Sequence, residues 1–273
     1  MIAAVDPVQV TLPAQPRRSP IQALQKTVSA SRLNCWSTCR LKFFFRYVQE
    51  IRKPPTASLH FGSVVHLVLQ AWNMGRWRKQ AFEIEKFRQV FEENWKKQST
   101  RINWDGEEEA QQKSAWSVLE MYFVETPIKA DDKPEAVEVP VEADLSHNGL
   151  PKLIGVLDLV RAGGRIVDFK TAAKTPDKED AAHLNETQLS CYSVLYREST
   201  GKLESGRELH HLIKTKTPKL VITEVGPMDN LQRVRLFKLM DSYVEGLARE
   251  DFVPSRSMNC LGCEFFNECR KWA

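Results

Sequence analysis

Two short apolar runs joined by a pair of glycines restrict the possible folds of this chain more than any other feature. The runs, residues 154–160 and 165–171, have the length and the β-branched content of strands. Gly163-Gly164 lies between them, and a glycine pair is typical of a hairpin turn because glycine readily adopts positive φ angles. The centre of the chain therefore predicts an antiparallel pair of strands.

Sequence patterns on both sides of this hairpin predict an α/β fold. Valines alternate with other residues between 137 and 141, and residues 209–215 and 220–225 form two more strand-like runs. Apolar residues elsewhere recur with helical spacing, and Ser29 or Ser31 can cap the first helix. The expected helices cover about residues 29–47, 62–73, 80–97, 105–123 (capped by Asp105), 184–199 and 228–250. We expect a small mixed central sheet wrapped by helices.

Length and composition indicate how the chain is organised. With 273 residues, 42% of them apolar, it can bury one large core, so we expect a single domain over residues 27–273 with a helical insertion at about 75–130. Residues 1–26 are rich in proline and poor in large apolar side chains, which predicts a flexible tail. No apolar run reaches about 18 residues and no secretory signal is visible, so we expect a cytoplasmic protein without membrane spans. The net charge of +4 permits a nucleic-acid partner without requiring one.

The expected hairpin carries two aspartates and a lysine. Asp168 and Lys170 alternate with Phe169 along one strand, so their side chains point to one face and Phe169 is buried behind them. A two-residue turn would place Phe169 opposite Asp158, whereas a three-residue turn, residues 162–164, would place Asp168 there. We expect the three-residue turn, because it brings both carboxylates together.

Two carboxylates and an ammonium on one face can support metal-dependent hydrolysis. Carboxylate oxygens suit a hard divalent ion such as Mg²⁺ or Mn²⁺, which polarises a phosphodiester and lowers the pKa of a bound water. Lys170 can orient that water or neutralise charge that develops on the phosphate. From spacing alone, a salt-bridged hairpin with charges facing solvent explains the pattern equally well.

A polar stripe on the expected second helix offers a further ligand. Ser63, His66, Gln70 and Asn73 share one side of a helix that otherwise carries large apolar residues. The stripe can face either a metal or solvent. His60, which precedes this expected helix, is interpreted as a surface or loop residue.

The hairpin residues resemble the (D/E)…(D/E)xK core of the PD-(D/E)XK nuclease superfamily, and the surrounding motifs resemble its RecB-like branch. The resemblance runs in family order over about residues 29–269. The matching motifs are Ser29-x-Ser31-Arg-Leu and Cys39-Arg-Leu-Lys-Phe-Phe, Phe61-Gly-Ser-x-x-His66, Asp158, Asp168-Phe169-Lys170 and Gln188-Leu-x-x-Tyr192.

This resemblance implies a restriction-endonuclease-like fold and a role for each matching residue. Asp158, Asp168, His66 and the carbonyl of Phe169 would bind the catalytic metal, and Lys170 would assist the attacking water. Gln188 and Tyr192, one helical turn apart, would line the site and hold substrate or Lys170. Glu138 lies where family members often carry a glutamate, although a charge at a strand edge explains it equally well.

Three cysteines lie close together near the carboxyl end, as Cys260-x-x-Cys263-x5-Cys269. Such spacing without secretion signals usually indicates a metal site. Iron–sulfur members of the RecB-like branch take a fourth cysteine from the first helix, which implies Cys39 here. The resemblance thus implies a [4Fe-4S] cluster that joins the first helix to residues 252–273, with structural zinc as the alternative.

Such a cluster would act as a structural clip across most of the sequence. Cys35, one turn before Cys39, could replace it as a ligand, whereas Cys191 has apolar neighbours and is expected in the core.

Basic residues near these motifs are candidate phosphate contacts, although a solvated charged face explains each of them individually. The candidates are Arg40, Lys42 and Arg46 on the first helix and Lys214 and Lys216 on a late strand.

The combined interpretation is a metal-dependent nuclease that is exonuclease-like on single-stranded DNA or DNA ends. The resemblance suggests roles in recombination and repair, CRISPR adaptation, or mobile-element and defence systems. The chain lacks a phosphate-loop motif, so it either acts alone or is brought to DNA by a helicase or integrase-type partner. The alternatives are a non-catalytic nucleic-acid-binding or assembly subunit with the same fold and, ranked last, an iron–sulfur redox protein.

Overall fold

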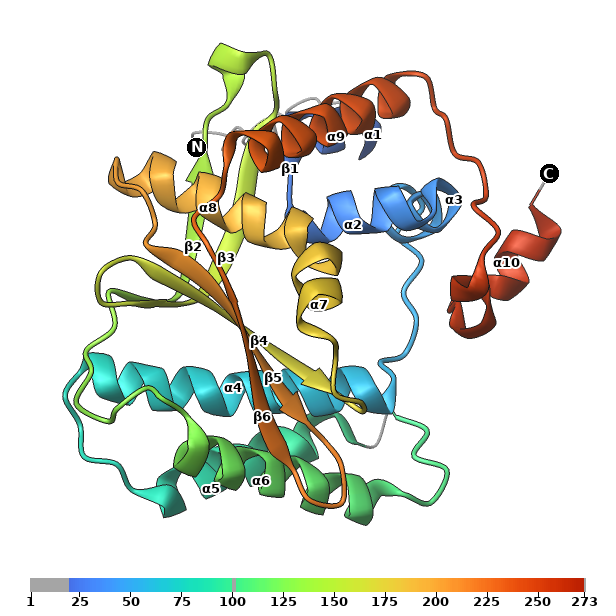
Figure 1. Cartoon of the computed structure of the whole chain (residues 1–273). Helices are drawn as coiled ribbons and strands as arrows, with labels where there is room; N and C mark the ends of the chain where they lie inside the picture. The colour runs from blue at the N-terminus through green and yellow to red at the C-terminus, as the bar shows by residue number, and fades with distance from the viewer. Residues whose placement is uncertain (1–19, 100–101, 273) are drawn as a thin grey trace, which may run out of the picture.

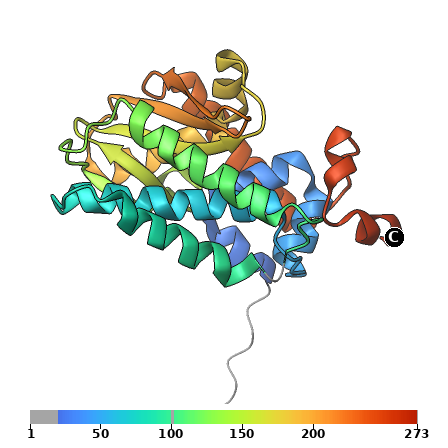
Figure 2. The same cartoon turned by 90° about the horizontal axis from the view of Figure 1, so that it is seen from below.

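A computed structural model describes residues 20–99 and 102–272, which form a mixed sheet between two layers of helices (Figures 1 and 2). No helix in this described part has an apolar stretch that could cross a bilayer. The α/β architecture with a mixed central sheet is confirmed.

The sheet has six strands in the order β1-β3-β4-β5-β6, with β2 paired to β3. The pairs β1–β3 and β4–β5 are parallel and the others are antiparallel. Two helices fill the connection between β4 and β5, as a parallel crossover requires. The strands are β1 (Thr27–Val28), β2 (Ala136–Ala143), β3 (Lys152–Arg161), β4 (Arg165–Ala172), β5 (Gly206–Ile213) and β6 (Lys219–Val225).

Helices cover both faces of the sheet (Figure 1). The long helices α4, α5 and α6 pack on one face, and α2, α8 and α9 pack on the other. Strand β4 alternates between the two layers, since Ile166 belongs to the α8 side and Val167 to the α4 side. The helices are α1 (Pro20–Lys26), α2 (Ala30–Thr38), α3 (Arg40–Phe43), a π-helical turn (Phe44–Val48), α4 (Ala57–Trp77), α5 (Ile84–Ser99), α6 (Glu108–Glu125), α7 (Lys178–Leu184), α8 (Glu186–Thr200), α9 (Asn230–Ala248) and α10 (Phe266–Lys271).

The turn between β3 and β4 has the expected length. Arg161 pairs with Arg165, so the turn consists of three residues, 162–164. Gly163 and Gly164 have φ angles of 80° and 73°. A side chain at Gly164 would also lie 2.4 Å from the hydroxyl oxygen of Tyr196, so this position has no room for a Cβ atom. The expected three-residue turn is therefore confirmed.

The expected first helix is wrong as one continuous element. Ser29 caps α2 as predicted, but Cys39 has extended backbone angles (φ −165°, ψ 115°) and separates α2 from α3. The expected tail is wrong for residues 20–26, which form α1 and bury Leu24. Residues 1–19 lie outside the described residues.

Three other sequence expectations also need correction. Helix α4 begins at Ala57, well before Gly62, because Thr56 supplies its N-cap. Asp105 does not cap α6, which begins at Glu108. Strand β5 ends at Ile213, so Lys214 and Lys216 follow the strand and do not share one of its faces.

Candidate active site

The two aspartates of the hairpin lie where β3 and β4 stop pairing. The last paired residues of the two strands are Leu159 and Val167. Beyond this pair, Asp158 Oδ2 replaces a backbone acceptor and accepts a hydrogen bond from the backbone N–H of Phe169 at 3.2 Å. Asp168 is 1% exposed and Asp158 is 9% exposed. The structure therefore holds both carboxylates at the edge of the core with fixed orientations.

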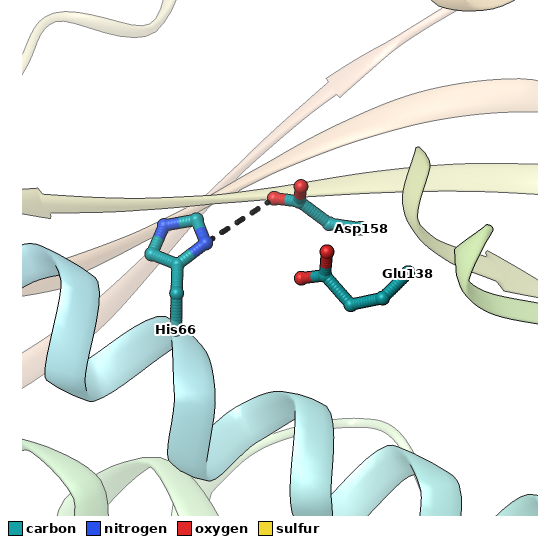
Figure 3. Close-up of side chains that lie close together, drawn as sticks. All are labelled: His66, Glu138 and Asp158. Atoms are coloured by element: carbon teal, nitrogen blue, oxygen red, sulfur yellow. Dashed lines mark ion pairs between the residues drawn. The ribbon is translucent and has the colours of Figure 1, made fainter. Parts of the chain in front are cut away.

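His66 approaches this carboxylate pair from α4. Its Nδ1 atom lies 3.6 Å from Asp158 Oδ2. The ligand atoms of His66, Glu138 and Asp158 all lie within 4.8 Å of one another, and Figure 3 shows the three side chains converging from a helix and two strands. An imidazole and two carboxylates at this spacing can hold a divalent cation.

Glu138 belongs to this group for a structural reason. The pairs Val137–Leu159 and Val139–Leu157 place it opposite Asp158 on the neighbouring strand. Its φ angle is 48°, which is unusual for a residue inside a strand and marks a strained position. The sequence pattern left Glu138 open, because an alternating strand gives no sign of this backbone conformation.

Lys170 is held by a hydrogen-bonded network. Its Nζ atom lies 2.7 Å from Asp168 Oδ2 and donates to Gln188 Oε1 at 2.8 Å. Gln188 Nε2 in turn donates to Asp168 Oδ1 and to the Tyr192 hydroxyl, both at 2.8 Å. Gln188 and Tyr192 come from α8, so this helix fixes the direction in which the ammonium points.

The site concentrates negative charge. Burial, reinforced by the neighbouring Asp168 carboxylate, raises the pKa of Asp158 above its ordinary value. Burial and the charge of Asp158 raise the pKa of Glu138 to about 7. These carboxylates therefore repel one another when ionised, and a divalent cation between them would relieve that repulsion.

A cleft of about 540 Å³ opens over these residues. Its walls come from α4 and from strands β2, β3 and β4, and they include His66, Glu138, Asp158 and Lys170. Gly62 of α4 faces β4 at close range, since a Cβ atom there would make a tight contact of 3.3 Å with Thr171 Oγ1.

A buried network supports Phe169 from the α4 side of the sheet. The rings of Tyr122 and His210 meet the Phe169 ring edge-on, at 5.7 and 5.8 Å. His210 lies 2.9 Å from the Tyr122 hydroxyl through Nδ1 and 2.9 Å from Glu208 Oε2 through Nε2. Burial alone would raise the pKa of Glu208, but the hydrogen bond and charge of His210, with Arg161, lower it to about 2. Sequence analysis missed this network, whose members come from α6 and β5.

Asp158, Asp168 and Lys170 lie inside a long region of the chain that matches a known family. A family profile described as the PD-(D/E)XK nuclease superfamily matches residues 27–270. This chain belongs to the PD-(D/E)XK nuclease superfamily.

A solved structure shares the fold of this chain. A candidate exonuclease from Eubacterium rectale superimposes with a TM-score of 0.65 at 16% sequence identity, and the match covers 93% of this nuclease and 90% of that chain. The protein SSO0001 matches with a TM-score of 0.36 and 14% identity over 84% of this chain and 91% of that chain. No curated protein shows a significant sequence match to the chain.

Four cysteines of the nuclease surround a second, smaller cavity. Cys39, Cys260, Cys263 and Cys269 line it together with apolar side chains such as Phe265. The break between α2 and α3 exposes Cys39 Sγ to the backbone N–H groups of Lys42 and Ser255, at 3.5 and 3.4 Å.

The other two cysteines do not line this cavity. Cys191 is fully buried, as expected of a core residue, and burial raises the pKa of Cys35 to about 11.

Ion pairs join the carboxyl-terminal segment to α3 and the residues that follow it. Arg40 pairs with Asp251, Arg46 pairs with Glu264, and Lys53 Nζ lies 2.5 Å from Glu268. Lys42 Nζ lies 3.6 Å from Glu264. Arg40, Lys42 and Arg46 are expected phosphate contacts, but in the structure their charges are paired with carboxylates of the protein itself.

The remaining basic candidates lie near the cleft. Lys214 lies over the Phe61 ring of α4, with Nζ 4.7 Å from its centre, and Lys216 is exposed in the β5–β6 turn. Contact of these residues with nucleic acid stays a prediction. The expectation that His60 is a surface or loop residue is wrong, since His60 is buried and meets the rings of Trp95 and Trp104 edge-on.

Proposed function

We propose that this nuclease hydrolyses DNA phosphodiester bonds with the help of Mg²⁺ or Mn²⁺ held in the cleft between α4 and strands β2, β3 and β4. The observation that supports the proposal is that His66, Glu138 and Asp158 converge within 4.8 Å of one another at one cleft, beside an Asp168 carboxylate that holds the Lys170 ammonium. The metal ligands would be His66, Asp158, Asp168 and the Phe169 carbonyl, and we add Glu138 to the expected set.

The residues fit a hard divalent ion. Carboxylate oxygens with one imidazole suit Mg²⁺ or Mn²⁺, and raised carboxylate pKa values identify a site that gains by binding positive charge. When bound, the ion would polarise the scissile phosphate and favour ionisation of a water molecule. Lys170, oriented by Asp168 and Gln188, would hold that water for attack and offset charge on the phosphate oxygens.

Cleavage assays test this proposal directly. Labelled single-stranded and duplex oligonucleotides are incubated with wild-type protein in Mn²⁺, Mg²⁺ or a chelator. We expect metal-dependent cleavage that falls by at least about 100-fold in Asp168→Asn. The matched control is Asp241→Asn, which changes an exposed aspartate of α9. Equal activity in Asp168→Asn and wild type would remove the catalytic assignment.

An exonuclease-like action on single strands or DNA ends is the substrate class we favour. The fold similarity to a candidate exonuclease is compatible with this class. The RecB-like branch implies work in recombination and repair, CRISPR adaptation or mobile-element and defence systems in the cytoplasm, with a helicase or integrase-type partner. Products resolved by length separate the modes of action, because an exonuclease releases mononucleotides or short ends and an endonuclease gives internal fragments.

A non-catalytic DNA-binding or assembly subunit remains the alternative. The cleft-lining carboxylates Glu138 and Asp158 argue against it, because a binding protein gains nothing from two carboxylates that face a phosphate. DNA binding without cleavage in any divalent ion, unchanged by Lys170→Ala, would favour that alternative.

For the second cavity, we propose a [4Fe-4S] cluster on Cys39, Cys260, Cys263 and Cys269. The four cysteines come from two segments far apart in the sequence and line one cavity, which supports a shared metal site, with structural zinc as the alternative occupant. The Cys39 hydrogen bonds from two backbone N–H groups are of the kind that stabilise cluster thiolates.

Metal analysis of protein purified without oxygen tests the cluster. We expect about four iron atoms per chain and visible absorption that is lost in Cys263→Ser. Cys191→Ser is the control, because Cys191 is buried away from the cavity. A colourless protein with stoichiometric zinc would contradict the iron assignment and support structural zinc at these cysteines.

A further inference from the structure

Two exposed leucines lie along the side of α4 that faces the cleft. Leu59 is 60% exposed and Leu67 is 41% exposed, and both line the cleft that contains His66, Asp158 and Lys170. They are eight residues apart on the helix, or about 12 Å along its axis, and exposed Ser63 lies midway between them on the same stripe.

Helix α4 therefore presents two parallel stripes to the cleft. Gly62, His66 and Gln70 form a half-buried inner stripe beside the metal ligands. Leu59, Ser63 and Leu67 form an exposed outer stripe next to it. Neighbouring stripes on a helix are about 5–6 Å apart, which is comparable to the distance between a phosphate and its own base. A strand whose phosphate reaches the inner stripe thus brings its sugars and bases to the outer stripe.

Leucine side chains in that place distinguish between nucleic-acid forms. A continuous duplex keeps its bases stacked inside and presents charged phosphates outward, so it offers the leucines no apolar partner. A single strand exposes base faces, which pack well against apolar side chains. A positive charge also lies beside α4, because Lys214 lies over the Phe61 ring of this helix and can pair with a neighbouring phosphate.

We propose that Leu59 and Leu67 pack against unpaired bases on either side of the scissile phosphate, so that the cleft selects single-stranded DNA over continuous duplex. This inference rests on the proposed nuclease function and adds the residues that select the substrate. Apolar contacts are made in the bound strand before and during cleavage, so their loss raises KM more than it lowers kcat.

The test compares wild type, the Leu59→Ala/Leu67→Ala double variant and Leu231→Ala. Leu231 is 66% exposed on α9 and does not line the cleft, so it controls for the loss of an exposed leucine. Initial rates are measured with Mn²⁺ on a labelled single strand and on a duplex closed by hairpins at both ends. A Leu59→Phe variant adds a conservative change, since a ring can also stack on a base.

We expect wild type to prefer the single strand, and the double variant to show a KM for it that is roughly tenfold higher with little change in kcat. The Leu231→Ala control should match wild type, and Leu59→Phe should keep a low KM. An unchanged KM in the double variant, or a wild-type preference for closed duplex, would overturn the inference while the nuclease function stands. If wild type cleaves nothing in any divalent ion, the nuclease proposal itself fails.

Discussion

The Lys170 ammonium donates a hydrogen bond to Gln188 Oε1 at 2.8 Å, and the amide of Gln188 returns a bond to Asp168 Oδ1. The Gln188 side chain of α8 thus fixes the position of Lys170 relative to Asp168, which lies two residues earlier on β4. Because the proposed mechanism depends on where the ammonium points, Gln188 should matter without touching the phosphate.

Gln188→Ala should therefore lower kcat by roughly 10–100-fold while changing thermal stability little. The physical reason is that Lys170 keeps its charge and its pair with Asp168 but loses one of two contacts that set its direction. Steady-state kinetics with saturating Mn²⁺ and a melting curve check both parts. A large loss of stability with normal kcat in the remaining folded protein would contradict this role.

Removing a site carboxylate should stabilise the metal-free protein. Burial and Asp168 raise the pKa of Asp158, so its ionised form is destabilising above that pKa. Asp158→Asn should raise the melting temperature at pH 8 without metal by several degrees. Added Mn²⁺ should stabilise wild type and leave the variant almost unchanged. If the variant melts lower than wild type without metal, the charge repulsion inferred here is wrong.

Metal affinity should depend on pH through Glu138. Its pKa is raised from 4.5 to about 7, so protons compete with the metal below that pH. Mn²⁺ affinity should weaken as the pH falls from 8 to 6, and Glu138→Gln should bind more weakly with a flatter dependence. The same shift means that stability from the protonated carboxyl is present below pH 4.5 and is lost as the pH rises through about 7. Calorimetric titration at several pH values measures the first effect, and melting curves measure the second.

Tyr122→Phe should destabilise the fold by about 1–3 kcal/mol, because it leaves His210 Nδ1 buried without its partner. Denaturant unfolding gives this free energy. The control is Tyr47→Phe, whose half-buried ring packs on Phe43 on the opposite side of the sheet. Equal stabilities of the two variants would mean that the Tyr122–His210 bond contributes nothing.

Much of the fold was predictable because its signals are local. The turn of residues 162–164 follows from two glycines and the placement of two aspartates, and Ser29 caps α2 as its side chain suggests. The break at Cys39 was not predictable from helical periodicity, because it depends on the thiol and on carboxyl-terminal residues more than 200 positions away.

Some residues of the site could likewise be predicted from local sequence patterns, and others could not. Asp158, Asp168 and Lys170 follow from strand alternation and hairpin register, which are properties of neighbouring residues. Glu138 depends on a positive φ angle, and the Tyr122–His210–Glu208 network joins α6 to β5, so neither leaves a pattern in any short window of sequence. His60 was misplaced for a related reason, since its burial depends on tryptophans from the 95–104 region.

The narrow contact between Gly62 and Thr171 has a mechanical consequence. The carboxylates are carried by the sheet, whereas His66 is carried one turn along from this glycine on a helix that belongs to a separate layer. A bulkier side chain at position 62, or a partner that moves α4 away from the sheet, would move the His66 imidazole away from Asp158 and Glu138 without moving these two carboxylates. The distance between the His66 imidazole and the carboxylates therefore depends on how closely α4 approaches β4 at Gly62.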